Sequence, residues 1–352
     1  MPLATEHGFQ LLDRQCAHGL LAAVAQPYFA QTRMTLSPEE QKFLPPHCKM
    51  ETMTVNSLML AQITTKSGFI AALDQSGGST PNALRQYGFT ERDYHGDDEM
   101  FRLMHEMRVR IMSSPSFTGD NVIGAILFKS TMEGEAKGNS VPSFLWEERG
   151  VVPFLKIDQG LERQADGVQL MKPIEELDAL LERAVAKKIF GTKMRSVIFE
   201  ADHKGIAAIV SQQFAYARKI LTKGLVPIVE PEISIGSASK KESEAILRTE
   251  LLRHLDTLSS DQQVMVKLTI PSVPDFFVPL SEHPAVGRVV ALSGGYSRSD
   301  ACDKLRQNHR MIASFSRALT QDVRHHMSDT DFDSSLRKSI EEIFAASVVK
   351  NQ

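Results

Sequence analysis

A buried parallel strand is indicated by the stretch Val264-Met265-Val266-Lys267-Leu268-Thr269-Ile270-Pro271, which is mostly apolar and ends at a proline. One lysine interrupts it. Burying an ammonium group costs free energy unless the group is paired or neutral. A buried lysine loses its proton readily, and the neutral amine is a nucleophile. Lys267 is therefore either a strand-end residue that reaches solvent or a reactive amine, and the other strands of the chain distinguish the two.

Length and composition are those of a globular protein with a sizeable core. The 352 residues can form one large α/β barrel or two ordinary domains, and 42% of them are hydrophobic and 24% charged. A net charge of -3 offers no global attraction for nucleic acid or an anionic membrane, and no apolar run approaches the ~20 residues of a spanning helix. The three cysteines are widely spaced, which is typical of a reducing compartment, so we expect a cytoplasmic protein.

From residue 67 onward, short apolar runs alternate with amphipathic stretches that have the apolar spacing of helices. Eight such runs in one chain predict a (β/α)8 barrel, an α/β fold, over residues 67–352. An open doubly wound sheet is the alternative, but the GxGxxG turn expected after its first strand is missing. The predicted strands are 69–74, 124–128, 151–158, 189–195, 225–232, 264–270, 288–293 and 312–316.

Residues 1–66 do not share this alternation and are predicted to be an N-terminal extension outside the barrel. Three interpretations remain open for them. They can be a packed or loosely ordered extension, an organelle-targeting segment, or an over-long start, with Met34, Met50 and Met53 as later starts.

The ends of the predicted strands carry charged and small polar residues. In a (β/α)8 barrel the carboxyl ends of the strands form the active-site face. Residues two apart on a strand share a face, so Met265, Lys267 and Thr269 are predicted to point inward together. Charges of both signs on so many strand ends predict a site. The strand-end residues are Asp74, Lys156, Asp158, Lys193, Arg195, Glu230, Glu232, Lys267, Thr269, Ser293, Gly294, Gly295, Ser316 and Arg317.

A site of this kind can make Lys267 reactive. For attack on a carbonyl near neutral pH, the pKa of this lysine has to fall from ~10.4 toward ~7–8. Burial and neighbouring cations both lower it, and Lys156, Lys193 and Arg195 are the candidate cations. Imine chemistry also needs groups that carry protons, and the carboxyls of Glu230 and Asp74 can do so.

Two loops in the same region are candidate phosphate sites. Ser293-Gly294-Gly295 lets backbone N–H groups approach an anion, and Arg317 after the last strand can add a guanidinium. Loops after strands seven and eight are the usual phosphate site of such barrels. The loop after the first strand contains Ser76 and Ser79, with Lys156 as a nearby cation. Two phosphate sites flanking a lysine predict a bisphosphorylated substrate.

These residues resemble one family. The motifs Ala72-Leu73-Asp74-Gln75-Ser76-Gly77-Gly78-Ser79, Val226-Pro227-Ile228-Val229-Glu230-Pro231-Glu232, Leu268-Thr269-Ile270-Pro271 after Lys267, and Leu292-Ser293-Gly294-Gly295 are similar to those of class I fructose-bisphosphate aldolase, bacterial-type branch. The similarity runs from about Ser67 to Lys350. It implies reversible cleavage of fructose 1,6-bisphosphate to dihydroxyacetone phosphate and glyceraldehyde 3-phosphate, in glycolysis and gluconeogenesis, through a lysine imine and without a cofactor or metal.

The resemblance also implies a role for each site residue. Lys267 would be the Schiff-base lysine, Glu230 the principal acid/base residue, and Asp74 the group that assists cleavage at the C4 hydroxyl. Lys193 would stabilise the imine-forming steps electrostatically. The remaining site positions would be Glu232, Arg195, Lys156 and Asp158, with Ser293, Gly294, Gly295 and Arg317 at the C1 phosphate and Ser76, Ser79 and Lys156 at the C6 phosphate.

Two departures from the animal-type pattern are visible. The chain ends in Lys350-Asn351-Gln352 without the C-terminal tyrosine, and Asn82 and Ala83 stand where animal-type members carry a basic pair. The alternatives are an imine-forming aldolase for another phosphorylated sugar, a zinc-dependent aldolase, and a non-catalytic barrel. A zinc enzyme needs several histidines at strand ends, and no histidine falls on a predicted strand end. The expected partners are a phosphorylated sugar and further copies of this chain, with no nucleic acid and no membrane.

Overall fold

The computed structural model describes residues 54–76 and 80–351. Met53–Gln352 form one compact unit by their internal contacts. The predictions made for residues 1–53 and for Ser79 lie outside the described residues. The predicted division at residue 66 stays a prediction.

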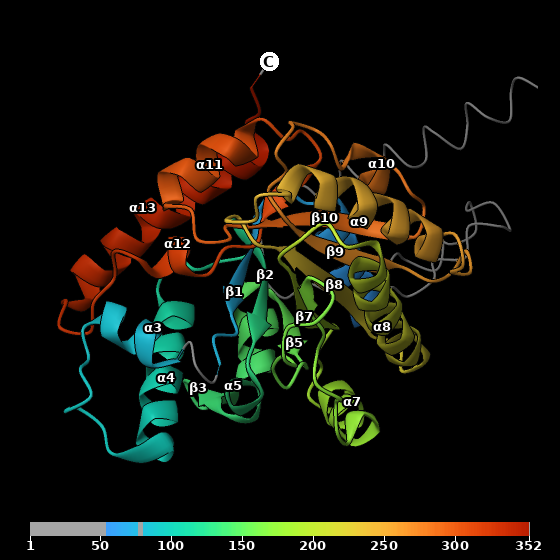
Figure 1. The fold of residues 1–352 in the computed structure, drawn as a ribbon. Helices are drawn as coiled ribbons and strands as arrows, with labels where there is room; N and C mark the ends of the chain where they lie inside the picture. Colours follow the sequence, from blue (N-terminus) through green and yellow to red (C-terminus); the bar gives the residue numbers. More distant parts are fainter. Residues whose placement is uncertain (1–53, 77–79, 352) are drawn as a thin grey trace, which may run out of the picture. The chain divides into compact units, whose positions relative to one another are not determined.

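Eight parallel strands form the barrel, which confirms the predicted (β/α)8 fold (Figure 1). They pair in the order β1-β2-β5-β7-β8-β9-β10-β11. The amide of Ala72 donates to the carbonyl of Phe315 at 3.0 Å and links the last strand back to the first. The strands are β1 (Phe69–Leu73), β2 (Val122–Leu127), β5 (Val152–Lys156), β7 (Gly191–Ile198), β8 (Val226–Ile233), β9 (Val264–Thr269), β10 (Val286–Leu292) and β11 (Met311–Ala313).

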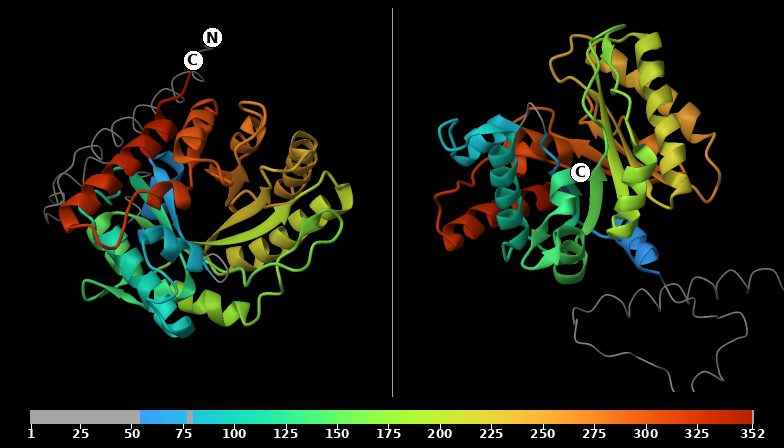
Figure 2. Two further views of the ribbon diagram at one scale, coloured as in Figure 1. Left: turned by 60° about the vertical axis from the view of Figure 1, so that its left-hand side comes forward. Right: turned by 90° about the horizontal axis from the view of Figure 1, so that it is seen from below.

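Helices surround the strands, as the left view of Figure 2 shows. Several begin at a side-chain cap: Asp202 accepts from the amide of Gly205 and Ser297 from that of Asp300. No helix of the described ranges is long and apolar enough to cross a membrane. The helices are α2 (Val55–Thr65), α3 (Thr80–Tyr87), α4 (Gly96–Ser113), α5 (Lys129–Glu133), α6 (Val141–Ser143), α7 (Leu177–Ala186), α8 (His203–Thr222), α9 (Lys240–Leu255), α10 (Val278–Ser281), α11 (Arg298–Arg306), α12 (Arg317–Thr320) and α13 (Asp329–Val348), with a π-helical turn, η3, at Phe144–Glu148.

The connection from β2 to β5 differs from the regular alternation. It consists of α5, a small hairpin of β3 (Glu135–Ala136) and β4 (Asn139–Ser140), α6 and η3, instead of one long helix. Another short strand, β6 (Val168–Gln169), pairs antiparallel with β7. These additions leave the order of the eight barrel strands unchanged.

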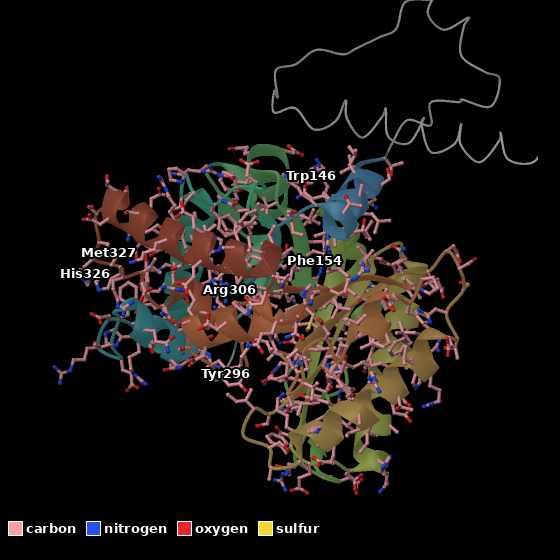
Figure 3. All side chains as sticks on the ribbon, turned by 90° about the horizontal axis from the view of Figure 1, so that it is seen from above. Trp146, Phe154, Tyr296, Arg306, His326 and Met327 are labelled. Atoms are coloured by element: carbon pink, nitrogen blue, oxygen red, sulfur yellow. The ribbon has the colours of Figure 1, made fainter. Side chains whose placement is uncertain are left out.

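The strands separate two apolar cores. Alternate side chains point into the barrel and outward to the helices, so Met265 belongs to the inner core and Val264, Val266 and Leu268 to the outer one. The predicted facing is therefore confirmed for these four residues. The ring of Phe154, labelled among the strands in Figure 3, is fully buried and packs edge-on against another ring of the inner core.

Helix α2 covers the amino-terminal end of the barrel. Met59 and Ile63 are buried and belong to the inner core. The side-chain amide of Gln62 donates to the carbonyls of Ile123 and Gly150 at 2.9 and 2.7 Å. The strand ends opposite this helix are left open, and that end of the barrel holds the charged residues.

Candidate active site

A cleft of about 540 Å³ lies at the carboxyl ends of the strands. It is lined by all of the predicted site residues except three. Thr269 bonds through Oγ1 to the backbone of Ile233, Gly295 adjoins Gly294, and Ser79 lies outside the described residues. The barrel therefore brings together residues that lie as much as 245 positions apart in the chain, as Ala72 and Arg317 do. The lining residues are Ala72, Asp74, Gln75, Ser76, Asn82, Ala83, Gln86, Lys156, Asp158, Gly160, Leu161, Lys193, Arg195, Glu230, Glu232, Lys267, Leu292, Ser293, Gly294, Ser314, Ser316 and Arg317.

Lys193 is the charged centre of the cleft. Its Nζ lies 2.8 Å from Oδ2 of Asp74 and 2.7 Å from Oε2 of Glu230, and all three side chains are buried. Burial by itself lowers the pKa of Lys193, but the carboxylates of Asp74 and Glu230 outweigh it and raise that pKa above its usual range. Burial likewise raises the pKa of Asp74, and the nearby lysines outweigh it, so the pKa of Asp74 lies below its usual range. Lys193 is thus a fixed cation and Asp74 a fixed anion near neutral pH.

Lys267 differs from Lys193 in its environment. Its side chain is only 4% exposed, and its Nζ lies 3.4 Å from Oε1 of Glu230. Burial lowers the pKa of Lys267, and the cation of Lys193 lowers it further, while the carboxylates of Glu230 and Asp74 oppose both. The net effect is a pKa of Lys267 below its usual value. A lysine of this kind supplies a neutral amine more readily than a solvated one does.

Two further ion pairs lie at the rim of the cleft. Nε of Arg195 lies 2.5 Å from Oε2 of Glu232, and Nζ of Lys156 lies 2.5 Å from Oδ1 of Asp158. Strands β7 and β8 run further than the sequence pattern predicts, to Ile198 and Ile233. The i, i+2 alternation still places Glu230 and Glu232 on the face that lines the cleft.

The loop after β10 has the backbone of an anion-binding turn. Gly294 and Gly295 have φ angles of 60° and 113°, a region that favours glycine. A Cβ on Gly294 would lie 2.7 Å from Cγ2 of Ile235, and one on Gly295 would lie 3.7 Å from Nη2 of Arg317. The turn and the guanidinium are therefore neighbours, as the sequence predicts for a phosphate site.

Two positioning contacts were not predicted from the sequence. The side-chain amide of Gln75 donates to Oγ of Ser316 at 2.6 Å and joins the loop after β1 to the loop after β11. Arg108 on α4 is 1% exposed and donates to the carbonyl of Gln75 and, at 2.8 Å, to Oγ1 of Thr131. Burial lowers the pKa of Arg108 to about 10, against the opposing carboxylate of Asp74. The available signal was a charge at helical spacing on the apolar face of α4.

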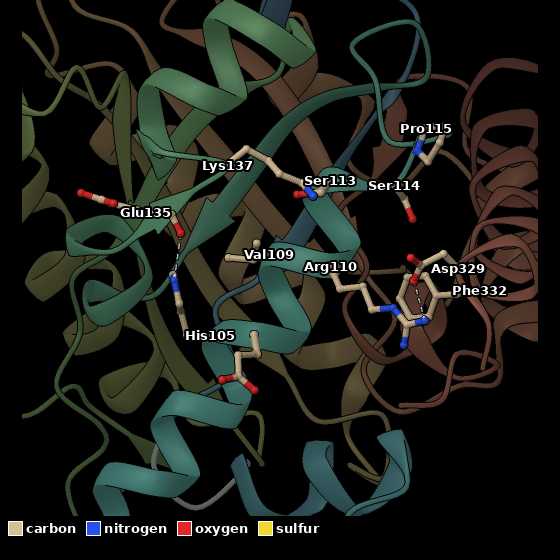
Figure 4. A pocket seen from close by; sticks show the side chains of 11 residues that line it. His105, Val109, Arg110, Ser113, Ser114, Pro115, Glu135, Lys137, Asp329 and Phe332 are labelled. Carbon is tan, nitrogen blue, oxygen red and sulfur yellow. Dashed lines mark hydrogen bonds and ion pairs between the residues drawn. The ribbon is translucent and has the colours of Figure 1, made fainter. Parts of the chain in front are cut away.

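A larger pocket, of about 640 Å³, lies outside the barrel mouth between α4, the β3–β4 hairpin and the start of α13 (Figure 4). Three carboxylates, those of Glu106, Glu135 and Asp329, line it together with the cations Arg110 and Lys137. Arg110 lies 3.0 Å from Asp329, and His105 bonds to the carbonyl of Glu135 at 3.1 Å. It contains none of the predicted site residues, so size alone does not make it the candidate active site.

A metal centre needs several ligands close together. Among the described residues, no group of three or more histidine, cysteine, aspartate or glutamate side chains could hold a metal ion. The chemical groups that the cleft does offer are amines, carboxylates, hydroxyls, side-chain amides and two guanidinium groups.

A (β/α)8 barrel with a buried amine, proton-carrying carboxyls and an anion-binding turn at its mouth is typical of aldolases. The family model described as "Glycolytic: Fructose-bisphosphate aldolase class-I" matches residues 59–274, more than half of the chain. The chain belongs to the class-I fructose-bisphosphate aldolase family and is a lyase of the aldolase type.

Comparison with solved structures agrees on the fold. Fructose-bisphosphate aldolase from Plasmodium falciparum, solved with TRAP and a small-molecule inhibitor, superposes with a TM-score of 0.69 at 19% identity and covers 84% of this chain and 95% of that chain. Cgl0159 from Corynebacterium glutamicum has a TM-score of 0.47 at 13% identity and covers 82% of this chain and 92% of that chain.

Proposed function

We propose that this protein cleaves fructose 1,6-bisphosphate reversibly into dihydroxyacetone phosphate and glyceraldehyde 3-phosphate through an imine on Lys267. The observation that carries the proposal is the contact of the Lys267 amine with the Glu230 carboxyl inside a buried group of charges. We also assign the chain to the bacterial-type branch of the family, to glycolysis and gluconeogenesis, and to the cytoplasm. The sequence motifs support the branch and the pathway, and the wide spacing of the three cysteines supports the cytoplasm.

The first half of the reaction forms the imine. The neutral amine of Lys267 attacks the C2 ketone, and the carbinolamine then loses water. The Glu230 carboxylate lies 3.4 Å from the amine, so it can accept the proton that the attacking amine loses and pass it to the C2 oxygen. Solvent supplies the second proton of the departing water. Lys193, held between Asp74 and Glu230, stabilises negative charge as these protons move.

The second half breaks the bond between C3 and C4. In this proposal Asp74 takes the proton of the C4 hydroxyl, so that the C4 oxygen becomes the aldehyde of glyceraldehyde 3-phosphate. The bond electrons pass into the iminium and leave an enamine on Lys267. Protonation at C3 and hydrolysis then release dihydroxyacetone phosphate.

The phosphate groups of the substrate have two places in the cleft. Ser293, Gly294 and Arg317 supply hydroxyl, amide and guanidinium groups. Ser76 and Lys156 line the same cleft, after β1 and at the end of β5. Two groups of anion-binding residues in one cleft with Lys267 support a bisphosphate as the substrate.

A second candidate is an imine-forming aldolase for a different phosphorylated sugar. The observation that favours it is the wall formed by α3, where Asn82, Ala83 and Gln86 line the cleft without a positive charge. A substrate without a second phosphate would be better accommodated there than a dianion. The ratio of kcat/KM for fructose 1,6-bisphosphate to that for fructose 1-phosphate discriminates the two candidates.

Trapping of the imine tests the proposed intermediate. Borohydride reduces an iminium to a stable amine, so treatment with dihydroxyacetone phosphate and borohydride should add covalent mass at Lys267. Peptide mass spectrometry locates the adduct. A protein that cleaves the substrate but carries no adduct at Lys267 would contradict the imine mechanism.

Removal of metal tests the zinc-dependent alternative. An iminium withdraws electrons from the breaking bond without a Lewis acid, so we expect activity to be unchanged after dialysis against EDTA. The measurement is the initial rate before and after chelation, with a zinc-dependent aldolase as the positive control. A loss that added zinc restores would favour the metal enzyme.

The Lys193→Met variant tests the electrostatics through pH. Without this cation, Asp74 and Glu230 act on Lys267 alone, so the pKa of Lys267 rises and less neutral amine is present at pH 7. The acid limb of the kcat/KM profile should therefore move to higher pH. Lys156→Met is the matched control, because Lys156 pairs with Asp158, and a smaller shift is expected there. If the acid limb shifts by the same amount in both variants, the cation of Lys193 does not set the pKa of Lys267.

A further inference from the structure

A separate pocket of about 350 Å³ opens at the amino-terminal end of the barrel, opposite the active-site cleft. It lies where β1, β10 and β11 begin and beside the end of α2. The lining residues are Thr64, Thr65, Lys66, Ser67, Gly68, Ser281, Gly287, Arg288, Val289, His309, Arg310, Ile312, Ser347 and Val348.

The charged residues that line this pocket are all basic. Lys66, Arg288 and Arg310 line it, and no aspartate or glutamate is among the lining residues. Asp275, which does not line the pocket, lies 2.7 Å from the lining residue His309. The pocket in Figure 4 is a useful contrast, because its cations are matched by carboxylates among its own lining residues.

The three cations have no carboxylate partners among the described residues. Arg288 donates from Nε to the carbonyl of Ile63 at 2.8 Å and from Nη2 to the carbonyl of Lys66 at 3.1 Å. It is half-buried, and burial lowers its pKa. The side chains of Lys66 and Arg310 are exposed and make no ion pair in the described ranges. Like charges that share a pocket repel one another, and a bound anion removes that repulsion.

We propose that this pocket binds a small, multiply charged phosphate compound. Guanidinium groups bind phosphate oxygens through parallel N–H donors, and lysine adds a mobile point charge. A volume of 350 Å³ is at the lower end of the range for small-molecule sites, about 300–1,000 Å³. None of the pocket residues lines the active-site cleft, so this site is separate from the reaction.

A consequence for α2 follows from the position of Arg288. This residue holds the last turn of α2, whose Met59 and Ile63 fill the end of the inner core. An anion that binds the native pocket and not the unfolded chain stabilises the folded protein. Binding should therefore also raise the temperature of unfolding.

The test is calorimetric titration of the full chain with inorganic pyrophosphate, in the Arg317→Ala background so that the cleft competes less. The double variant Lys66→Glu/Arg310→Glu should weaken binding at least about tenfold, because two attractive charges become repulsive. The control is Lys219→Glu/Lys338→Glu, two exposed lysines on α8 and α13, which changes the net charge equally. The control should bind as the parent does.

Equal affinity in the charge-reversed variant and the control would overturn the proposal, as would the absence of pyrophosphate binding in the parent. The neutral pair Lys66→Gln/Arg310→Gln repeats the measurement in case charge reversal prevents folding, and it should bind weakly as well. Aldol cleavage, measured with Arg317 intact, should stay within about twofold in the Lys66→Glu/Arg310→Glu variant, because charges at the far end of the barrel are screened from the cleft. Pyrophosphate binding and aldol cleavage are measured separately. A negative result for this pocket therefore does not contradict the proposed function.

Discussion

Replacing Lys267 with methionine should reduce aldol cleavage by roughly 10⁴-fold or more, because the nucleophile is removed and no neighbouring amine is free to replace it. Methionine has a similar length and no charge, and the site is 3% exposed, so the folded state should be retained. Lys193 cannot substitute, since Asp74 and Glu230 keep it protonated. The measurement is kcat with fructose 1,6-bisphosphate, together with borohydride trapping, which should give no adduct.

The matched control is Lys241→Met, an exposed lysine on α9. It should leave kcat and the unfolding temperature unchanged. A Lys267→Met protein that keeps more than about a tenth of the parent activity would show that another group carries the chemistry.

Replacing Glu230 with glutamine should lower kcat by about 10²–10⁴-fold, the usual contribution of a general acid–base group. Substrate affinity should change far less, because the carboxyl acts on protons and not on the phosphates. Loss of this carboxylate also removes a group that raises the pKa of Lys267, so the acid limb of any residual rate should move to lower pH. Steady-state kinetics across pH measure both effects.

Glu232→Gln provides the comparison. Its carboxylate is held by Arg195 at 2.5 Å and makes no recorded contact with Lys267. The loss of turnover should be smaller than for Glu230→Gln. An unchanged kcat in Glu230→Gln would assign the proton transfers to another residue.

The local pattern of apolar and polar residues was sufficient to predict the barrel and most of the residues that line its cleft. Period-two alternation placed Met265 and Lys267 on the inner face, and the structure agrees, because the pleat of a strand depends only on neighbouring residues. The same reasoning predicted that Asp74, Glu230 and the other charged strand-end residues lie together at the carboxyl end of the barrel. Parallel strands of one barrel end at the same face, whatever their separation in the chain.

The sequence by itself determined which residues face the cleft; the tertiary structure alone decided which of them are partners. Lys193 and Asp74 are 119 positions apart and Gln75 and Ser316 are 241 apart, so both contacts depend on closure of the barrel. Three-dimensional packing also gives Lys193 two carboxylates and Lys267 one, which separates a permanent cation from a potential nucleophile. The physical reason is that facing follows from a short-range repeat, whereas ion pairing and burial depend on distances between strands that no local pattern contains.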